Sequence, residues 1–581
     1  MDWLGQEGHG EVCLSCFPLD QATTTAGPFA ACRGGGPAQP YRVADRELSK
    51  WLDIWSWHGD KRTPAELIPE PGTHMEPLTG ADIERVAATF PIGTAMGADQ
   101  FQPKLIEGLS AGAHDRMTQL LNGVERAGEW PGRCMLAIMV SLGKPGGGTR
   151  LIALLQTLVR VWSRARRSYT KQWEDAHRHP CFYGCTGRSS SAAAMDRDLQ
   201  EEAAVAAGGY STTVLLDLAK AFDSVAWDVF VAEAAATGFP MQLLALILQT
   251  YHMARVVKVE RSLSRACQVF QSILAGCMHA TTGLNIVLYR AVIRTAAANP
   301  RTTIRFFVDD GTVQATGPGM TPARRAVHCA GMLLQEYKGL RLFPSKGKLK
   351  AVTSSTEVHR HIRSVRRRHG ISIADWARNL GHDCRRSGTA RVIAGDRLKK
   401  GRCTGARVQQ LGKAVGKRAH RLVRCAILPS VTHSAAVQGA TDTQLARMRT
   451  ATAAAMGLPR YTGHTAHMLL AQQADADPMF GVTVPRLATY LQLLWAGALR
   501  LEQLSATWRS LEAKLEASTR PWALVTGPLG PLRAHCGESD GGAHRPLYGG
   551  TVAGSTTTFS GPRRPSCSGG SRRRSGTGSG P

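Results

Sequence analysis

The feature that most constrains the fold of this chain is an apolar run that stops on an acidic side chain. Val214, Leu215 and Leu216 are followed directly by Asp217. A short run of this kind is typical of a buried strand. A carboxylate at the end of a buried strand costs free energy unless it is solvated, paired or bound to a cation. Taken alone, Asp217 could also cap a following helix, so this segment leaves both interpretations open.

A second acidic feature lies in the segment TTIRFFVDDGTVQATG (302–317), where strand-forming residues flank Asp309-Asp310-Gly311. The Asp-Gly step is typical of a tight hairpin turn, so we expect the turn at these three residues. A plain surface hairpin is one interpretation. Two adjacent carboxylates repel each other, however, and a cation site explains both of them.

The two segments together suggest one site. If the strand ends meet, Asp217, Asp309 and Asp310 could hold two Mg²⁺ ions, with Mn²⁺ as an alternative. Magnesium prefers oxygen ligands and keeps some of its water, so a few carboxylates suffice. Two ions about 3.5–4 Å apart would stabilise the attacking 3′-oxygen and the leaving pyrophosphate of a nucleotidyl transfer.

The charge of the chain points to a polyanionic partner. The net charge of the 581 residues is +27. Residues 341–430 contain 23 Lys and Arg against 4 Asp and Glu, which gives this stretch a net charge of +19. A solvated face usually mixes both signs, so nucleic acid is the favoured partner and an acidic membrane surface the second. No stretch reaches the roughly 18 consecutive apolar residues of a membrane helix, and we expect no membrane partner.

Composition divides the chain into segments. We expect a loosely ordered leader at 1–45 and a low-complexity, disordered tail at 521–581. Between them we expect an α+β region and a basic helical region, with helices at 78–90, capped by Thr79, and at 101–110. The predicted boundaries are 46–200 and 201–355 within the α+β region, 356–458 for the basic helical region and 459–520 for a helical extension.

The cysteines do not indicate a disulfide framework. Fourteen cysteines in a chain of this length suit a reduced, intracellular protein, and the N-terminus lacks the features of a secretory signal. Cys13 and Cys16 form a CxxC pair near His9 and Cys32. A zinc knuckle is one interpretation, but the spacing is poor and ordinary thiols are preferred.

Several segments together resemble a known family. DLAKAFDSV (217–225) and FVDD (307–310) resemble the palm of reverse transcriptases, particularly those of non-LTR retrotransposons. The resemblance covers about residues 80–455 and implies a right-hand polymerase with fingers, a palm built on an antiparallel sheet, and a helical thumb. The other segments that carry it, in order, are AMGADQFQPKLI (95–106), GKPGGGTRLIALLQTLVRVW (143–162), FYGCTGRSSSAAA (182–194), GLRLFPSKGKLKAV (339–352) and the primer-grip-like WARNLGHD (376–383).

The resemblance implies roles for residues around the three aspartates. Lys144 and Arg150 would neutralise the triphosphate of the incoming nucleotide. Phe222 would lie under its sugar and exclude a 2′-hydroxyl, unless Phe222 is only a core aromatic. Lys346, with Lys348 close by, would donate a proton to pyrophosphate, although a surface lysine is an equal reading.

Three further positions follow from the same resemblance. Gly276 aligns with a glycine that helps to hold the template and the incoming base pair. Arg188 is a candidate template or nucleotide contact. Asp223 should point away from Asp217 and is not expected to bind metal.

One motif departs from the family pattern. The family usually has Gln before the glycine at 276 and a small polar residue with Pro after it, but this chain has Ala275 and Ala280-Thr281. Two hypotheses follow. The chain is an active RNA-directed DNA polymerase that uses an RNA template, a DNA primer and dNTPs, or it is a catalytically weakened remnant that still binds nucleic acid. A metabolic phosphotransferase is disfavoured, because the sequence has no P-loop and no dinucleotide-binding glycine pattern.

The expected location is intracellular and nuclear. This expectation rests on function alone, because the product of a retrotransposon polymerase must reach chromosomal DNA.

Overall fold

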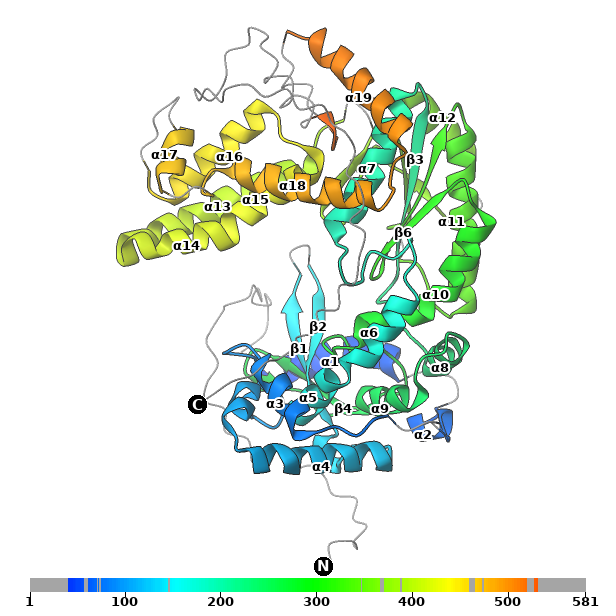
Figure 1. Cartoon of the computed structure of the whole chain (residues 1–581), viewed down its shortest axis with the longest axis vertical. Coiled ribbons are helices and arrows are strands. Elements are labelled where there is room, and N and C mark those ends of the chain that lie inside the picture. The colour runs from blue at the N-terminus through cyan, green and yellow to red at the C-terminus, as the bar shows by residue number, and fades with distance from the viewer. Residues whose placement is uncertain are drawn as a thin grey trace, which may run out of the picture. The chain divides into compact units, whose positions relative to one another are not determined.

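The computed structural model describes residues 40–56, 61–70, 72, 75–144, 147–345, 347–365, 370–386, 389–458, 465–472, 475–519 and 527–530. The chain divides into two units, Met1–Ala534 and His535–Pro581, and all described residues belong to the first unit. Helices and strands are interleaved along this unit, and most of the strands form a four-stranded and a five-stranded sheet (Figure 1). The predicted α+β fold class is confirmed. Within the described ranges, every helix is too short or too polar to span a lipid bilayer.

The N-terminal part is helical. The prediction of a capped helix at 78–90 is confirmed. The Thr79 side chain accepts a hydrogen bond from the Asp82 backbone N–H, and the Asp82 carboxylate accepts one from the Thr79 backbone N–H. The prediction of a helix at 101–110 is met only by a 3₁₀ helix, η2, that begins at a proline. The elements are α1 (Pro40–Trp55), α2 (Pro64–Leu67), α3 (Gly80–Ala88), η2 (Pro103–Gly108), α4 (Ala111–Ala127) and η3 (Gly132–Cys134).

The first sheet has four strands in the order β2-β1-β4-β5. β1 pairs antiparallel with β2 and parallel with β4, so β1 is an inner strand. The strands are β1 (Leu136–Gly143), β2 (Thr149–Leu154), β4 (Ala254–Val259) and β5 (Ser262–Leu263). The helices that accompany them are α5 (Thr157–Ala165), α6 (Arg167–Ala176), α8 (Trp227–Ala236) and α9 (Met241–His252).

The second sheet has five strands in the order β6-β7-β3-β8-β9. All pairs are antiparallel except β8 with β9. The apolar run that ends at Asp217 is the central strand β3, as predicted. The strands are β3 (Tyr210–Asp217), β6 (Thr303–Phe307), β7 (Asp310–Gly317), β8 (Lys350–Thr353) and β9 (Ser372–Ile373).

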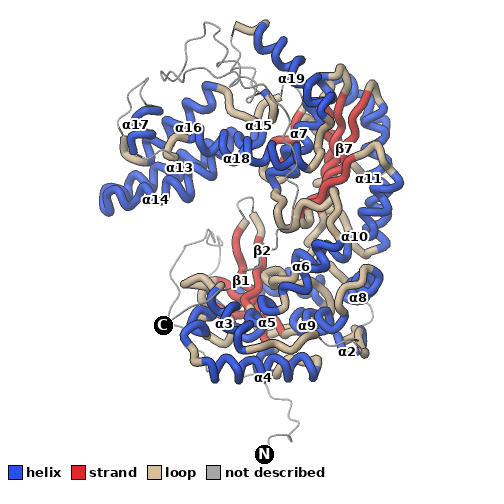
Figure 2. Tube along the Cα trace, in the orientation of Figure 1, coloured by secondary structure: helices blue, strands red, loops and turns tan. Residues whose placement is uncertain are grey.

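The two faces of this five-stranded sheet differ in chemistry. Val214 and Leu216 of β3 point to an apolar face that packs against α11 (Thr321–Gly339). The other face carries Arg305 and Gln314, whose side chains bond to residues of α7 (Ser190–Ala206). Figure 2 shows α7 and α11 flanking β7. Because side chains alternate along a strand, Asp217 lies on the polar face.

The hairpin between β6 and β7 turns at a different place from the one predicted. Phe307 pairs with Asp310, so Val308 and Asp309 form the turn, and the Asp310-Gly311 step lies inside β7. β7 pairs with β3 along eight residues, and this long-range register overrides the local preference of Asp-Gly for a turn. Val308 consequently adopts φ +61°, a left-handed conformation that is strained for a β-branched residue.

Gly311 is needed for packing rather than for the turn. A Cβ atom at this position would lie 2.8 Å from Cε1 of Phe306 on the neighbouring strand. The glycine of the Asp-Gly step is therefore required, but the reason is the close approach of Gly311 to Phe306 on the neighbouring strand and not a turn.

The segment WARNLGHD forms a second hairpin of β10 (Trp376–Asn379) and β11 (His382–Arg385). Leu380 and Gly381 make its turn with φ values of +50° and +81°. Ala377 and Cys384 pack with Leu215, so the hairpin covers the polar face of the five-stranded sheet. The Asp383 carboxylate accepts hydrogen bonds from the backbone N–H groups of Ile393 and Ala394, and it thereby caps the next helix.

The range 356–458, predicted to be mostly helical, also contains the strands β9, β10 and β11. The remaining elements are helical. They are α10 (Ala280–Ala298), α12 (Thr356–Val365), α13 (Val392–Val415), η5 (Gly416–Ala419), α14 (His420–Leu422), a π-helical turn η6 (Val423–Ile427), α15 (Leu428–Gln438), α16 (Asp442–Ala455), α17 (Thr465–Gln472), α18 (Pro478–Trp495) and α19 (Leu501–Glu516).

Two boundary predictions need correction. The leader predicted at 1–45 is helical from Pro40, because Ala44 and Leu48 of α1 are fully buried in the main core. In the tail predicted from 521, Leu529 is also fully buried, and its backbone N–H donates to the Glu202 carboxylate. Cys13, Cys16, Cys32, Lys346 and residues 531–581 lie outside the described residues.

Candidate active site

The three aspartates meet at one end of the five-stranded sheet. Asp217 closes β3 and Asp310 opens β7, and the two are direct cross-strand partners in the antiparallel register. Side chains of such partners lie on the same face of a sheet. Asp309 precedes Asp310 in the turn. The sequence analysis expected the two acidic segments to meet, and the register between β3 and β7 brings Asp217 beside Asp310.

Burial and neighbouring carboxylates raise the pKa of both Asp309 and Asp310. Burial, the Asp309 carboxylate and the Asp217 carboxylate raise the pKa of Asp310 to about 6. Burial and Asp217 also raise the pKa of Asp309 above its usual range. Three acids of this kind form a site where added positive charge is favourable.

A lysine supplies part of that positive charge. Lys348 Nζ lies 2.9 Å from Oδ2 of Asp217. Its segment is fixed beside β3 by two backbone hydrogen bonds, from Ser345 N to Asp217 O and from Ala219 N to Phe343 O. In this arrangement, and within the described ranges, no three His, Cys, Asp or Glu side chains converge closely enough to hold a metal ion.

Both predicted triphosphate-binding residues come from the hairpin of β1 and β2. Arg150 is exposed on β2 and close enough to Asp309 to lower the pKa of that carboxyl. Lys144 follows β1, and its backbone N–H donates to the carbonyl of Gly148 across the loop. Lys144 lies near Lys220 and Asp223: burial lowers the pKa of Lys220 and raises that of Asp223, and the charge of Lys144 makes a smaller, lowering contribution to each pKa. Arg150 therefore faces the acidic cluster, while Lys144 faces the loop after β3.

Phe222 and Gly276 lie on adjacent loops. The backbone N–H of Ile273 donates to the carbonyl of Phe222 over 2.7 Å, and Phe222 is half-buried against the core. Gly276 has φ +115°, and a Cβ there would lie 2.6 Å from the carbonyl oxygen of Ala153 on β2. The Ala153 N–H in turn donates to the Ala275 carbonyl. Only glycine fits this position, between β2 and the loop after β3.

Two further predicted residues have structural partners. Asp223 Oδ1 accepts a hydrogen bond of 2.9 Å from Trp55 Nε1, and burial raises its pKa. Arg188 Nη1 donates to the carbonyl oxygens of His179, Pro180 and Phe182. Arg188 thus ties down the loop before α7, and its predicted contact with template or nucleotide remains a prediction.

The structure adds residues that the sequence interpretation missed. Trp376 and Arg378 are exposed on the same side of β10, and Arg378 is close enough to Asp310 to lower the pKa of that carboxyl. Their alternation with buried Ala377 and Asn379 was visible in the sequence. Its meaning depended on knowing which sheet the hairpin covers.

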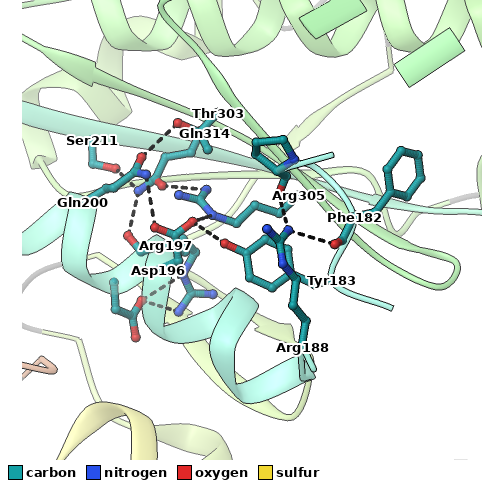
Figure 3. A network of polar contacts seen from close by, with 12 residues as sticks. Phe182, Tyr183, Arg188, Asp196, Arg197, Gln200, Ser211, Thr303, Arg305 and Gln314 are labelled. Atoms are coloured by element: carbon teal, nitrogen blue, oxygen red, sulfur yellow. Dashed lines mark hydrogen bonds and ion pairs between the residues drawn. The ribbon is translucent and has the colours of Figure 1, made fainter. Parts of the chain in front are cut away.

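A buried polar network supports the sheet behind the aspartates (Figure 3). Arg305 Nε donates to Asp196 Oδ2 over 2.5 Å, and Arg305 Nη1 donates to Gln314 Oε1 over 2.9 Å. Tyr183 also donates to Asp196 Oδ2 over 2.8 Å. The network links β6 and β7, which flank the turn at Asp309, to α7. Sequence reasoning had no signal for a charge buried in the strand β6.

Comparison with protein-family models matches part of this chain. Residues 142–365 match the family model of reverse transcriptase (RNA-dependent DNA polymerase). The matched stretch begins at the end of β1 and contains β2, both acidic segments and the loop at Gly276. None of the curated proteins matches this chain. Residues 142–365 are therefore assigned to the reverse transcriptase family, whose activity is that of an RNA-directed DNA polymerase, a nucleotidyltransferase.

Proposed function

We propose that this chain is the polymerase of a non-LTR retrotransposon, which copies an RNA template by adding dNTPs to the 3′ end of a DNA primer. The observation that carries the proposal is the pairing of Asp217 with Asp310, next to Asp309 and opposite Arg150. In a right-hand polymerase the five-stranded sheet would be the palm. The hairpin of β1 and β2 would belong to the fingers, and the helices from α13 onward to the thumb.

The carboxylate oxygens of the three aspartates are ligands of the type that hard divalent cations prefer, and the side chains would have to turn toward one another to hold two such ions. Asp217, Asp309 and Asp310 offer carboxylate oxygens, and their mutual repulsion would be relieved by Mg²⁺ or Mn²⁺. When bound, the ions would stabilise the attacking 3′-oxygen and the pyrophosphate leaving group. Lys348 would have to leave Asp217 or share it, because its ammonium group occupies one carboxylate oxygen.

The cations of the chain would bind the triphosphate. The Arg150 guanidinium is planar and suits bidentate contact with phosphate oxygens, and Lys144 would add a point charge. Lys348, two residues after the predicted general acid Lys346, is a second group that could deliver a proton to pyrophosphate. Its position 2.9 Å from Asp217 supports that role.

The Phe222 ring would select the sugar. The hydrogen bond from the Ile273 backbone N–H to the Phe222 carbonyl fixes the main chain at this position, and it thereby sets the point from which the ring extends. A 2′-hydroxyl on the incoming nucleotide would meet the ring, and dNTPs would therefore be preferred over rNTPs.

The basic helices would bind the template–primer duplex. Along α13 the basic side chains that are exposed include Lys399, Lys400, Arg402, Arg407 and Lys413. Such contacts to phosphate give affinity without reading sequence, as a polymerase requires, and they make binding depend strongly on salt. A nuclear location would follow from this function, since the DNA product must reach a chromosome.

Primer extension tests the proposal. The protein is supplied with an RNA template, an annealed DNA primer, dNTPs and Mg²⁺, and Asp309→Asn serves as the inactive control. Extension that is no greater than that of Asp309→Asn would refute the assignment as an active polymerase. In the active enzyme, Phe222→Ala should relax the discrimination against rNTPs, and unchanged discrimination would exclude the role of Phe222 in sugar selection.

A second candidate is a weakened remnant that binds nucleic acid without efficient synthesis. The observation that favours it is Ala275, which stands where the family usually has Gln. The Ala275 backbone is held by Ala153, so the departure removes a side chain rather than the loop. Retained binding of the template–primer duplex without extension would support the remnant. Substitution of Ala275→Gln should then raise the rate of extension.

A further inference from the structure

One face of α1 carries three large side chains that are spaced four residues apart. Glu47, Trp51 and Trp55 are 4%, 5% and 0% exposed, respectively. Residues at this spacing lie above one another on a helix, so the three form a single stripe. The two indole rings stack, with 5.8 Å between their centroids. α1 lies well before the matched residues 142–365, yet the stripe faces segments inside them.

The first contact joins α1 to the hairpin of β1 and β2. The Glu47 carboxylate accepts a hydrogen bond from the Thr149 hydroxyl, and Thr149 is the chain neighbour of Arg150. Burial alone would raise the pKa of Glu47, but hydrogen bonds from Lys50 and Thr149 lower it overall. Glu47 is therefore an ionised acceptor that holds the base of β2.

The second contact joins α1 to the loop after β3. Lys220 Nζ lies 3.9 Å from the centroid of the Trp51 ring, which is a cation–π contact. Lys220 has φ +48°, an uncommon conformation for a lysine. The indole ring thus stabilises a sharp bend two residues before Phe222.

The third contact lies on the other side of Phe222. Trp55 Nε1 donates to Asp223 Oδ1 over 2.9 Å, and the Arg255 guanidinium lies 4.6 Å from the same ring. Trp55 O also accepts from the backbone N–H of Phe270, at the start of the loop that contains Gly276. One helix face therefore touches the residue beside Arg150, both sides of Phe222 and the loop of Gly276.

We propose that the stripe Glu47-Trp51-Trp55 is a positioning element for the incoming nucleotide. It sets the separation between the cations that would bind the triphosphate and the Phe222 ring that would lie under the sugar. The inference rests on the proposed function. It differs from simple core packing because the three contacts end on the pocket segments themselves, and two of them are polar and directional.

The substitution Trp55→Phe tests this role with a matched control. It keeps a buried ring but removes the hydrogen bond to Asp223. Trp130→Phe makes the same chemical change elsewhere, because Trp130 is 5% exposed and its Nε1 donates to Thr250 Oγ1 over 3.0 Å. Single-nucleotide extension gives KM for the dNTP and kcat, and dNTP against rNTP incorporation gives the discrimination ratio.

We expect Trp55→Phe to raise KM for the dNTP about tenfold, the size of effect expected when a buried acceptor loses its hydrogen-bond donor, with kcat within about twofold. The discrimination ratio should fall, and affinity for the template–primer duplex should not change. Trp130→Phe should lower the thermal midpoint about as much as Trp55→Phe does, but it should leave KM for the dNTP unchanged. If Trp55→Phe proves unstable, Glu47→Ala should raise KM in the same way, and Glu47→Gln, which keeps an acceptor for Thr149, should largely restore it.

An unchanged KM in both Trp55→Phe and Glu47→Ala, or an equal rise in Trp130→Phe, would overturn the inference. A separate measurement distinguishes this failure from failure of the proposed function. Equilibrium binding of a labelled dNTP with Ca²⁺ and template–primer duplex requires no chemistry. Wild-type protein that binds the dNTP but does not extend would contradict the polymerase proposal alone, and the same variants then decide the inference through Kd. Wild-type protein that binds no dNTP would overturn both.

Discussion

The buried ion pair behind the aspartates offers a sharp test of how the sheet is stabilised. Arg305 on β6 and Asp196 on α7 are 2% and 5% exposed, and their bond of 2.5 Å is shielded from water. Substitution of Arg305→Met keeps most of the side-chain volume and removes the charge. The Asp196 carboxylate is then left with the Tyr183 hydroxyl and the Gln200 amide as donors.

The magnitude follows from the cost of an uncompensated buried charge. Removal of one partner of a buried pair typically lowers the free energy of unfolding by about 3–5 kcal/mol. Asp196→Asn in the same chain should recover part of the loss, because a neutral amide needs less solvation. The double variant Arg305→Met with Asp196→Asn should therefore have a higher free energy of unfolding than Arg305→Met alone.

Urea denaturation, followed by intrinsic fluorescence and by circular dichroism, measures these free energies. Arg294→Met is the matched control, because Arg294 pairs with Glu336 at the surface, where the two side chains are 51% and 30% exposed. Surface pairs contribute about 0–1 kcal/mol, so this control should stay close to wild type. If Arg305→Met costs less than about 1 kcal/mol, or if Asp196→Asn deepens the loss, the network does not hold the sheet in the way argued above.

Three other outcomes are expected. Gly276→Ala should abolish primer extension and lower the thermal midpoint, because its Cβ would lie 2.6 Å from the Ala153 carbonyl oxygen at φ +115°; an active, stable variant would contradict the described loop. Gly311→Ala should lower the free energy of unfolding by about 1–3 kcal/mol in urea, since its Cβ would approach the Phe306 ring to 2.8 Å. Without divalent ions, stability should fall as the pH rises from about 4 to about 6, because the pKa of Asp310 is 3.8 when unfolded and about 6 when folded, so the folded state holds the proton more tightly. Asp310→Asn should remove that part of the pH dependence, and an identical profile for the variant and wild type would refute this assignment.

Prediction of strands and helix starts succeeded where the signal was local. The apolar run before Asp217 specified β3, and Thr79 with Asp82 specified the start of α3. The turn at Val308 and Asp309 was not predictable in this way. It is imposed by pairing between β7 and β3, which are almost a hundred residues apart in sequence, and the Asp-Gly step favoured the wrong position.

Residues whose role depends on distant partners could not be found from the sequence. Arg305 in a strand is usually assigned to a solvated face, and only the fold shows Asp196 beside it. Trp51 and Trp55 are typical core residues of an amphipathic helix, and nothing local connects them with Lys220 or Asp223. Motif spacing locates groups that act along one segment, whereas contacts between segments require the assembled core.

The placement of α1 also has a practical consequence for anyone who wishes to produce the polymerase in pieces. The match to the family model begins at residue 142, and a fragment cut to residues 142–365 would look complete by that criterion. Such a fragment would uncover the apolar surface that Leu48, Trp51 and Trp55 normally shield. Exposed patches of this kind promote aggregation. A fragment for work in solution should therefore start at or before Pro40. The residues that match the family model are fewer than the residues that fold together.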